Sequence, residues 1–204
     1  LDQDAALLSR LAMPENPVIK VIRVQGRLEH EGLEAVAQAD LVSASALLDL
    51  VSATWLDQLI DAIQARGAAA LFTLNYAGEV CWQGKPDPDD DWMQQLVNRH
   101  QQGEKGMGVA LGPDAVLHAC ARFRRLGYCC ETAPSPWRLS RSADEALASA
   151  WMRGWADAAR SLIPEQAERI HAWLARRTRD FTLGKLQIEV GHLDLLALPL
   201  EMQS

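Results

Sequence analysis

The chain has 204 residues, of which 49% are hydrophobic and 23% charged, and its formal net charge at pH 7 is −7. These values fit one well-cored domain, or one domain with a small appendage, and the negative charge argues against a surface that binds nucleic acid. No apolar run approaches the ~18 residues of a membrane span, and the four cysteines suggest neither a zinc site nor a disulfide framework. We therefore expect a cytoplasmic protein without membrane, nucleic-acid or metal partners.

The first part of the chain predicts strands that alternate with helices. Residues 5–12 predict a short helix, and the β-branched stretch 18–24 predicts a strand. The more apolar stretch 39–45 predicts a second, central strand. A capping-box spacing at Thr54 opens a helix with one apolar stripe, and Gly67 ends it.

The middle of the chain continues this alternation. Residues 68–75 predict a third strand, and residues 76–83 predict a small hairpin that turns at Ala77 and Gly78. A polar helix follows from about residue 92 to residue 102. The next helix starts at residues 112–114, where a proline occupies an early position.

The last third predicts two strands separated by a helical pair. Residues 128–132 predict the fourth strand, and residues 186–199 a long closing strand that bends at Gly191. Between them, a capping box at Ser142 opens one helix and residues 164–177 predict another. The tryptophans of this pair fit a packed core better than a cage for a cation, and the arginine clusters are interpreted as solvated helix faces. The tryptophans are Trp137, Trp151, Trp155 and Trp173. The arginines are Arg122, Arg124, Arg125, Arg176, Arg177 and Arg179.

Several segments resemble class I S-adenosylmethionine-dependent methyltransferases. Residues 1–8 resemble the end of the second strand of that family and the helix after it, and residues 39–52 resemble its fourth-strand motif. Residues 126–128 and 186–199 resemble its sixth and seventh strands, of which the last is antiparallel. Shorter motifs at residues 98–101, 105–106, 111–114, 135–137 and 191–194 are similar to a bacterial branch of the family.

The resemblance implies an α/β fold: a three-layer sandwich whose mostly parallel, Rossmann-like sheet has an antiparallel last strand and an inserted helical pair. It covers nearly the whole chain as one methyltransferase-like domain, 1–204, with a loop and helix insertion at 76–111 and a helical insertion at 140–183. The family's glycine-rich turn after the first strand has no counterpart near the start of the chain, because residues 1–105 contain no G-x-G. Either the chain is a fragment of a longer protein or the cofactor site is incomplete, and we expect a fragment that lacks the N-terminal part of the fold.

The resemblance implies S-adenosyl-L-methionine as the cofactor and assigns six residues to it. Asp2 is expected to accept hydrogen bonds from both ribose hydroxyls, although it could instead cap a helix or be solvated. Asp4 is the fallback. The side-chain amide of Gln25 could form a hydrogen bond with the adenine, and Gly26 would let the backbone approach the cofactor closely. Small side chains leave room beside the sulfonium, unless they only form a strand-end turn: Ser43, Ala44 and Ser45.

Four further residues are candidates for the substrate side. Asp49 could orient a substrate amine or cap a neighbouring helix, and Tyr76 could form a wall of the pocket or pack in the core. Arg99 and His100 lie on the polar helix and are the first candidates for substrate recognition, although a single histidine is more often structural or solvated. His192 is interpreted as a strand-bend residue bonded to Asp194.

The sequence thus predicts methyl transfer from the cofactor to a small molecule, by direct alignment of nucleophile and methyl group and with no assigned catalytic residue. The alternative is a catalytically inactive methyltransferase-like domain that binds a nucleoside or a protein. A nicotinamide-dependent Rossmann enzyme lacks its fingerprint here. The inserted helices could serve as a lid or as the face of a homodimer.

Overall fold

The structure is a computed structural model that describes residues 2–11, 18 and 20–200. Its sheet strands are β1 (Leu41–Ser45), β2 (Ala69–Gly84), β3 (Tyr128–Pro134), β4 (Trp137–Leu139) and β5 (Leu186–Pro199). Its α-helices are α1 (Ala5–Arg10), α2 (Leu33–Val36), α3 (Ala53–Arg66), α4 (Asp90–Gln101), α5 (Ala115–Arg125), α6 (Arg141–Leu162) and α7 (Ala167–Thr182). Short turns of other helix types are η1 (Leu28–Gly32), η2 (Leu48–Leu50), η3 (Gly112–Asp114) and η4 (Pro164–Gln166).

The sheet has the order β1-β2-β5-β3, and β4 also pairs with β5. The pair β1 and β2 is parallel, whereas β5 is antiparallel to β2, β3 and β4. Of the strands in the described part of the chain, β5 is therefore the one that runs against the others. The predicted Rossmann-like α/β fold is confirmed in this respect, as is the helical pair, α6 and α7, that precedes the last strand.

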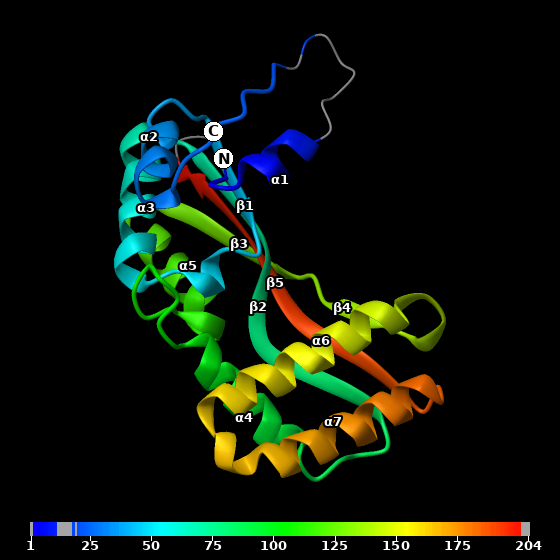
Figure 1. Ribbon diagram of the computed structural model, residues 1–204. Helices are drawn as coiled ribbons and strands as arrows, with labels where there is room; N and C mark the ends of the chain where they lie inside the picture. Colours follow the sequence, from blue (N-terminus) through cyan, green and yellow to red (C-terminus); the bar gives the residue numbers. More distant parts are fainter. Residues whose placement is uncertain (1, 12–17, 19, 201–204) are drawn as a thin grey trace.

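Helices cover the two faces of this sheet at opposite ends. Leu195 and Ala197 of β5 belong to a hydrophobic cluster with α3 and α5, whereas Leu186, Ile188 and Val190 belong to a second cluster with α4, α6 and α7. Since neighbouring residues of a strand point to opposite faces, the odd- and even-numbered residues place the two clusters on different sides of the sheet. Figure 1 shows β2 and β5 running from one end to the other.

The segments expected as insertions meet in the second cluster. Helix α4 contributes Met93, α6 contributes Met152 and Trp155, and α7 contributes Trp173, all of them buried. The ring of Trp82 on β2 lies 5.8 Å from that of Trp155 and 5.6 Å from that of Trp173, centroid to centroid. The interpretation as core residues is therefore confirmed for Trp155 and Trp173, whereas Trp151 is partly buried and Trp137 is 36% exposed. The inserted helices pack on the extended parts of β2 and β5.

The hairpin predicted at residues 76–83 is wrong, because β2 continues through it to Gly84. The pairing of β2 with β5 shifts in register between Tyr76 and Val80, so the expected turn is a bulge. Gly78 has φ 80° there, and a Cβ on it would lie 2.7 Å from the Cβ of Pro113. The irregularity expected at Gly191 of β5 is thus found on the neighbouring strand β2. Gly191 lacks a Cβ and so allows the carbonyl oxygen of Glu79 to approach β5.

The strand predicted at residues 18–24 does not form. The described residues of this segment are coil, and an isolated parallel bridge joins Gln25 to Asp2. The side chains of Val18 and Ile22 are 88% and 69% exposed. A β-branched sequence forms a stable strand only beside a partner strand, and here the bridge at Gln25 supplies one residue pair.

Three helices differ from their predicted bounds or burial. Helix α1 ends at Arg10, and its apolar side chains are largely exposed. Ala12, the predicted end of this helix, lies outside the described residues. Helix α3 is capped by Ser52, whose Oγ accepts from the N–H of Trp55, rather than by Thr54. Helix α6 begins after Ser140 instead of Ser142, and its Ser140 N–H donates to Asp144. The cap at Ser52 explains the earlier start of α3, whereas the side chain of Ser140 forms no capping hydrogen bond at the start of α6.

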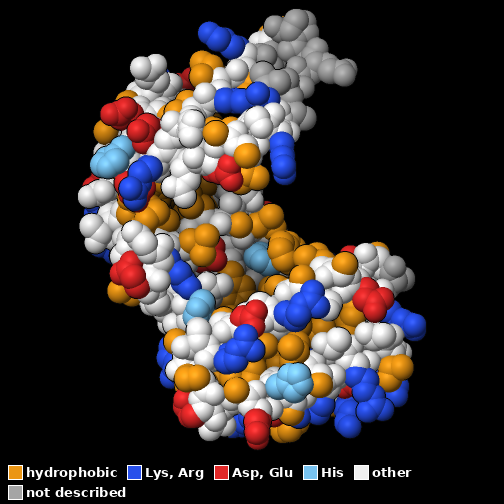
Figure 2. Space-filling view, in the orientation of Figure 1, with side chains coloured by type: hydrophobic (Ala, Val, Ile, Leu, Met, Phe, Trp, Pro, Cys, Tyr) orange, Lys and Arg blue, Asp and Glu red, His pale blue; other side chains and the backbone are white. Residues whose placement is uncertain are grey.

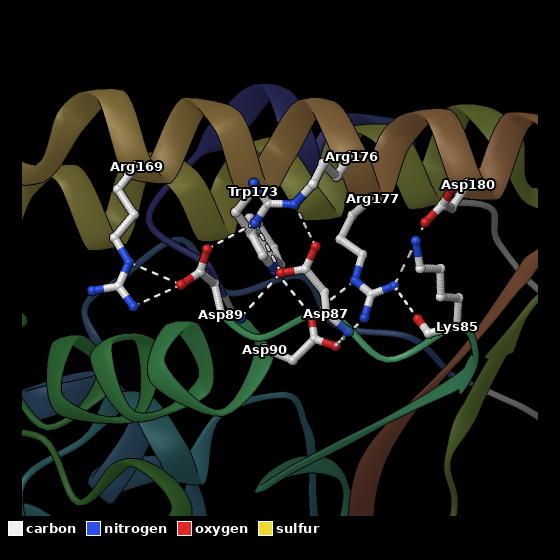
Figure 3. A network of polar contacts seen from close by, with 9 residues as sticks. All are labelled: Lys85, Asp87, Asp89, Asp90, Arg169, Trp173, Arg176, Arg177 and Asp180. Carbon is white, nitrogen blue, oxygen red and sulfur yellow. Dashed lines mark hydrogen bonds and ion pairs between the residues drawn. The ribbon is translucent and has the colours of Figure 1, made fainter.

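Arg177 corrects the interpretation of the arginine clusters as solvated faces. Its side chain is 0% exposed and forms an ion pair with Asp90, and it also donates to the carbonyl of Lys85. Arg176 and Arg169 pair with Asp87 and Asp89 of the same loop (Figure 3). This network attaches the loop between β2 and α4 to helix α7.

Tyr128 connects β3 to the end of helix α3 inside the first hydrophobic cluster. Its buried hydroxyl lies 2.9 Å from the carbonyl oxygen of Ala68 and 3.3 Å from that of Ile63, at the end of α3. We expect Tyr128→Phe to lower the free energy of unfolding by about 1 kcal/mol, because buried carbonyl groups lose a donor. Urea unfolding followed by circular dichroism measures this, and an unchanged midpoint would show that the bond contributes nothing.

Candidate functional site

The strands β1 and β2 both leave regular geometry at the same row of the sheet. Ser45 pairs with Thr73, and the next residue, Ala46, has φ 51° and donates its N–H to the carbonyl of Thr73. Leu74 on β2 has φ 54°. Positive φ is unfavourable for residues other than glycine and is concentrated at ligand sites. Since ligands of open α/β sheets bind at the carboxyl ends of parallel strands, this row is the place to look for a site.

A cavity of about 500 Å³ lies along β1, which is an edge strand of the sheet. Its lining includes Asp2, Ser43, Ala44 and Ser45, four of the six residues assigned to the cofactor. A second cavity of about 390 Å³ is lined by Asp2 and Gly26, together with Arg27 and residues 105–107. Asp2 therefore belongs to both cavities, and residues far apart in the sequence meet around it.

Asp2 and Asp4 have different surroundings. Asp2 is partly buried, and its Oδ1 accepts from the N–H of Asp4 at 2.8 Å. Asp4 is the N-cap of α1 and accepts from the N–H groups of Ala6 and Leu7. The capping function therefore falls to Asp4, and among the described residues no hydrogen bond reaches the second oxygen of Asp2.

Gln25 and Gly26 lie beside Asp2. The amide of Gln25 donates to the carbonyl of Gln3 at 3.4 Å, and the N–H of Gly26 donates to the carbonyl of Asp2 at 3.0 Å. A Cβ on Gly26 would lie 2.7 Å from the side chain of Glu31. Glycine is thus required at position 26 for close packing, whereas the Gln25 side chain is held against the backbone.

The substrate-side candidates Asp49 and Tyr76 lie next to each other near the end of β1, at a place that we call the strand-end site. Asp49 is 7% exposed on η2, and Tyr76 is 7% exposed on β2. Burial raises the pKa of Asp49, which the backbone N–H groups of Asp49 and Tyr76 partly offset. Burial and the charge of Asp49 also raise the pKa of Tyr76, whose hydroxyl donates to Asn98 of α4.

His192 is a residue of this site that the sequence interpretation missed. It pairs with Tyr76 across the β2–β5 ladder, and its ring lies 6.4 Å from that of Tyr76 and 4.9 Å from that of Trp137. Its Nδ1 lies 3.0 Å from the carbonyl oxygen of Val190, so the predicted bond to Asp194 is wrong. The Asp194 carboxylate instead accepts from the Leu74 N–H and the Ser135 hydroxyl.

Asp194 and Asn75 hold the bent strands in place. Asp194 accepts from the N–H of Leu74 at 2.8 Å and from the hydroxyl of Ser135 at 2.6 Å. The amide of Asn75 donates to the carbonyls of Phe72 and Leu193. These bonds satisfy backbone groups that the irregular geometry frees, which fixes the position of the residues between them.

Arg99 and His100 are not brought to the Asp49 and Tyr76 pair by any contact among the described residues. Arg99 is exposed on α4. The Nδ1 of His100 lies 3.3 Å from the Nζ of Lys105, and Lys105 lines the smaller cavity with Asp2. Burial and then the charge of Lys105 lower the pKa of His100. His100 is therefore associated with the cofactor-side cavity rather than with the strand-end site.

One solved structure is similar to this chain at low identity. No family model matches the chain, and no curated protein matches it. The chain is similar to the crystal structure of a SAM-dependent methyltransferase from Geobacter sulfurreducens in complex with S-adenosyl-L-homocysteine. The identity is 18% and the TM-score 0.27; the match covers 80% of this chain and 59% of that one.

Within the described residues, histidine, cysteine and acidic side chains do not gather in groups of three that could hold a metal ion. None of the described helices is long and apolar enough to cross a membrane.

Proposed function

We propose that this protein is an S-adenosyl-L-methionine-dependent methyltransferase that acts on a small molecule. The observation that carries the proposal is the cavity beside β1, which is lined by Asp2 together with Ser43, Ala44 and Ser45. The family resemblance of the sequence implies a role in cofactor binding for the same four residues. The antiparallel β5 between β2 and β3 supports the same family, because its last strand is antiparallel.

The residues of this cavity fit the proposed cofactor. Its volume of about 500 Å³ is in the usual range of small-molecule sites. The free oxygen of Asp2 would accept from ribose hydroxyls, and the small side chains at positions 43–45 would leave room for the rest of the molecule. The cofactor supplies an electrophilic methyl group, and the protein holds the acceptor in line with it and excludes water.

Binding of S-adenosyl-L-homocysteine tests the proposal through Asp2. We expect Asp2→Ala to weaken binding roughly 10- to 100-fold, since hydrogen bonds to a charged group contribute about 1.5–3 kcal/mol. Isothermal titration calorimetry on the full-length protein measures the change. Asp91→Ala, at an exposed position of α4, is the control and should bind as the parent does.

The outcomes separate the two candidate functions. No binding by the parent protein would exclude the methyltransferase. Binding that is unaffected by Asp2→Ala would move the ribose away from this carboxylate. Binding without cofactor turnover against any small molecule would favour the inactive, nucleoside-binding domain.

A further inference from the structure

Asp49 has an unpaired oxygen in the interior. The residue is 7% exposed, and in the described part of the chain its Oδ1 has no hydrogen-bond partner. A buried carboxylate oxygen without a partner costs free energy, so such an atom requires an explanation. Its place beyond the end of β1 and beside the strained residues Ala46 and Leu74 indicates a ligand as the missing partner.

His192 presents a second open acceptor at the same edge. A carbonyl oxygen can only accept, so the Nδ1 that lies 3.0 Å from Val190 O carries the proton. In the neutral ring, Nε2 then carries the lone pair. Burial lowers the pKa of His192, which favours this neutral form at pH 7. The ring therefore offers an acceptor that can also take up a proton.

Tyr76 connects these two groups. Its backbone N–H interacts with the Asp49 carboxylate, and its Cα pairs with that of His192. Tyr76 therefore brings Asp49 and His192 to the same part of the sheet.

The charged groups and aromatic rings near Asp49 and His192 indicate which kind of ligand would bind. The carboxylates of Asp49 and Glu79 act on Tyr76, and that of Asp194 acts on His192. In the described chain, these three are the charged groups that act on the two rings. Trp137 adds an aromatic face that is 36% exposed. A negative field next to aromatic walls favours a planar ring on which positive charge develops.

We propose that the methyl acceptor of this protein is an aromatic primary amine, bound with one N–H donated to Asp49 Oδ1 and the other to His192 Nε2. This inference rests on the proposed methyl transfer. An NH₂ group has two donors for the two open acceptors, whereas a hydroxyl has one. The ring of the acceptor would lie against Tyr76 and Trp137.

The step balances with the residues at hand. The lone pair of the amine nitrogen forms the new N–C bond while the S–C bond breaks, and that electron pair returns to sulfur. The nitrogen becomes positively charged, which the Asp49 carboxylate stabilises. One N–H proton then passes to Nε2 of His192 and from there to water. No oxidant or further reactant is needed.

Aniline and phenol, which have the same shape, are the probes. Ligand-observed NMR titrations use the full-length protein saturated with S-adenosyl-L-homocysteine. We expect aniline to bind at least about 10-fold more tightly than phenol, since unmet buried acceptors penalise the ligand with fewer donors. Asp49→Leu, which removes both oxygens at similar volume, should abolish the preference, and Glu131→Gln on the exposed part of β3 should preserve it.

A second measurement does not depend on the probe. Long-range ¹H–¹⁵N spectra of the imidazole should show His192 as the neutral Nδ1–H form at pH 7. An imidazolium there, or equal binding of phenol and aniline, would overturn the amine assignment while leaving the methyltransferase intact. A failure of the protein to bind S-adenosyl-L-homocysteine would instead remove the proposed function, whereas an aniline preference that depends on Asp49 would still uphold the amine site.

Discussion

Replacing Arg177 with alanine is expected to lower the free energy of unfolding by about 3–5 kcal/mol, because it leaves a buried carboxylate without its partner. The Arg177 side chain is 0% exposed, and its Nε donates to Asp90 Oδ1 at 2.8 Å. Its Nη1 donates to the carbonyl of Lys85 at 2.8 Å, and the indole of Trp173 donates to the same Asp90 oxygen. Figure 3 shows these groups converging between the loop and α7.

Arg160→Ala is the matched control for this prediction. Arg160 also pairs with an aspartate, Asp157, but both side chains are more than half exposed. Exposed pairs contribute ~0–1 kcal/mol, so this variant should unfold near the parent midpoint. Guanidinium unfolding monitored by tryptophan fluorescence reports on the second cluster, where Trp82, Trp155 and Trp173 lie. Equal midpoints for both variants would contradict the buried pair.

The double variant Arg177→Met with Asp90→Leu separates the pair from its parts. Replacing both members of a buried ion pair by apolar residues is often close to neutral. We therefore expect the double variant to recover most of the stability that Arg177→Ala loses. A loss as large as that of the single variant would mean that the contacts to Lys85 and Trp173, rather than the pair, are decisive.

Replacing Asp49 with asparagine is expected to raise the free energy of unfolding at pH 7 by about 1–3 kcal/mol, because it removes the cost of a buried charge at nearly unchanged side-chain volume. The folded-state pKa of Asp49 is raised by burial. As pH increases above the unfolded value, the unfolded chain ionises first, and the parent protein loses stability until the folded pKa is passed. The gain from the substitution should therefore be small at low pH and reach a plateau above that window.

Denaturant unfolding at several pH values measures this difference. Glu131→Gln, which removes a charge from an exposed strand position, is the control and should show no such pH dependence. If Asp49→Asn destabilised the protein at pH 7, the Asp49 charge would have a compensating partner inside the protein. A stabilised variant that no longer prefers aniline would show that the residue is retained for binding, at the expense of stability.

The regular part of the fold follows from sequence patterns. The apolar stretch before Ser45 forms β1, and the stripe of Leu56, Leu59, Ile60 and Ile63 forms the buried side of α3. The last strand was also predicted with its bounds, Leu186–Pro199. Hydrophobic periodicity is a local property, so it identifies elements whose burial depends on one face of one segment.

The errors occur where a partner distant in the chain decides. A β-branched segment at residues 18–24 stays irregular with one bridging pair, and a glycine that suggested a turn at Gly78 forms a bulge because β5 continues beside it. Arg177 looks like a surface residue in sequence, but Asp90 and Lys85 make its burial possible. Pairing across the sheet and across helices has no local signature.

The sequence by itself determined the α/β class, the position of the last strand, and the four residues at positions 2 and 43–45 that line one cavity. Tertiary structure alone decided the strand-end site, because Asp49 and His192 are 143 positions apart and each looks ordinary in its own segment. Pairing of Tyr76 with His192 brings them together, and burial leaves one oxygen of Asp49 without a hydrogen-bond partner among the described residues. The unmet hydrogen-bonding capacity of a buried group is a property of the folded chain, and no residue pattern contains it.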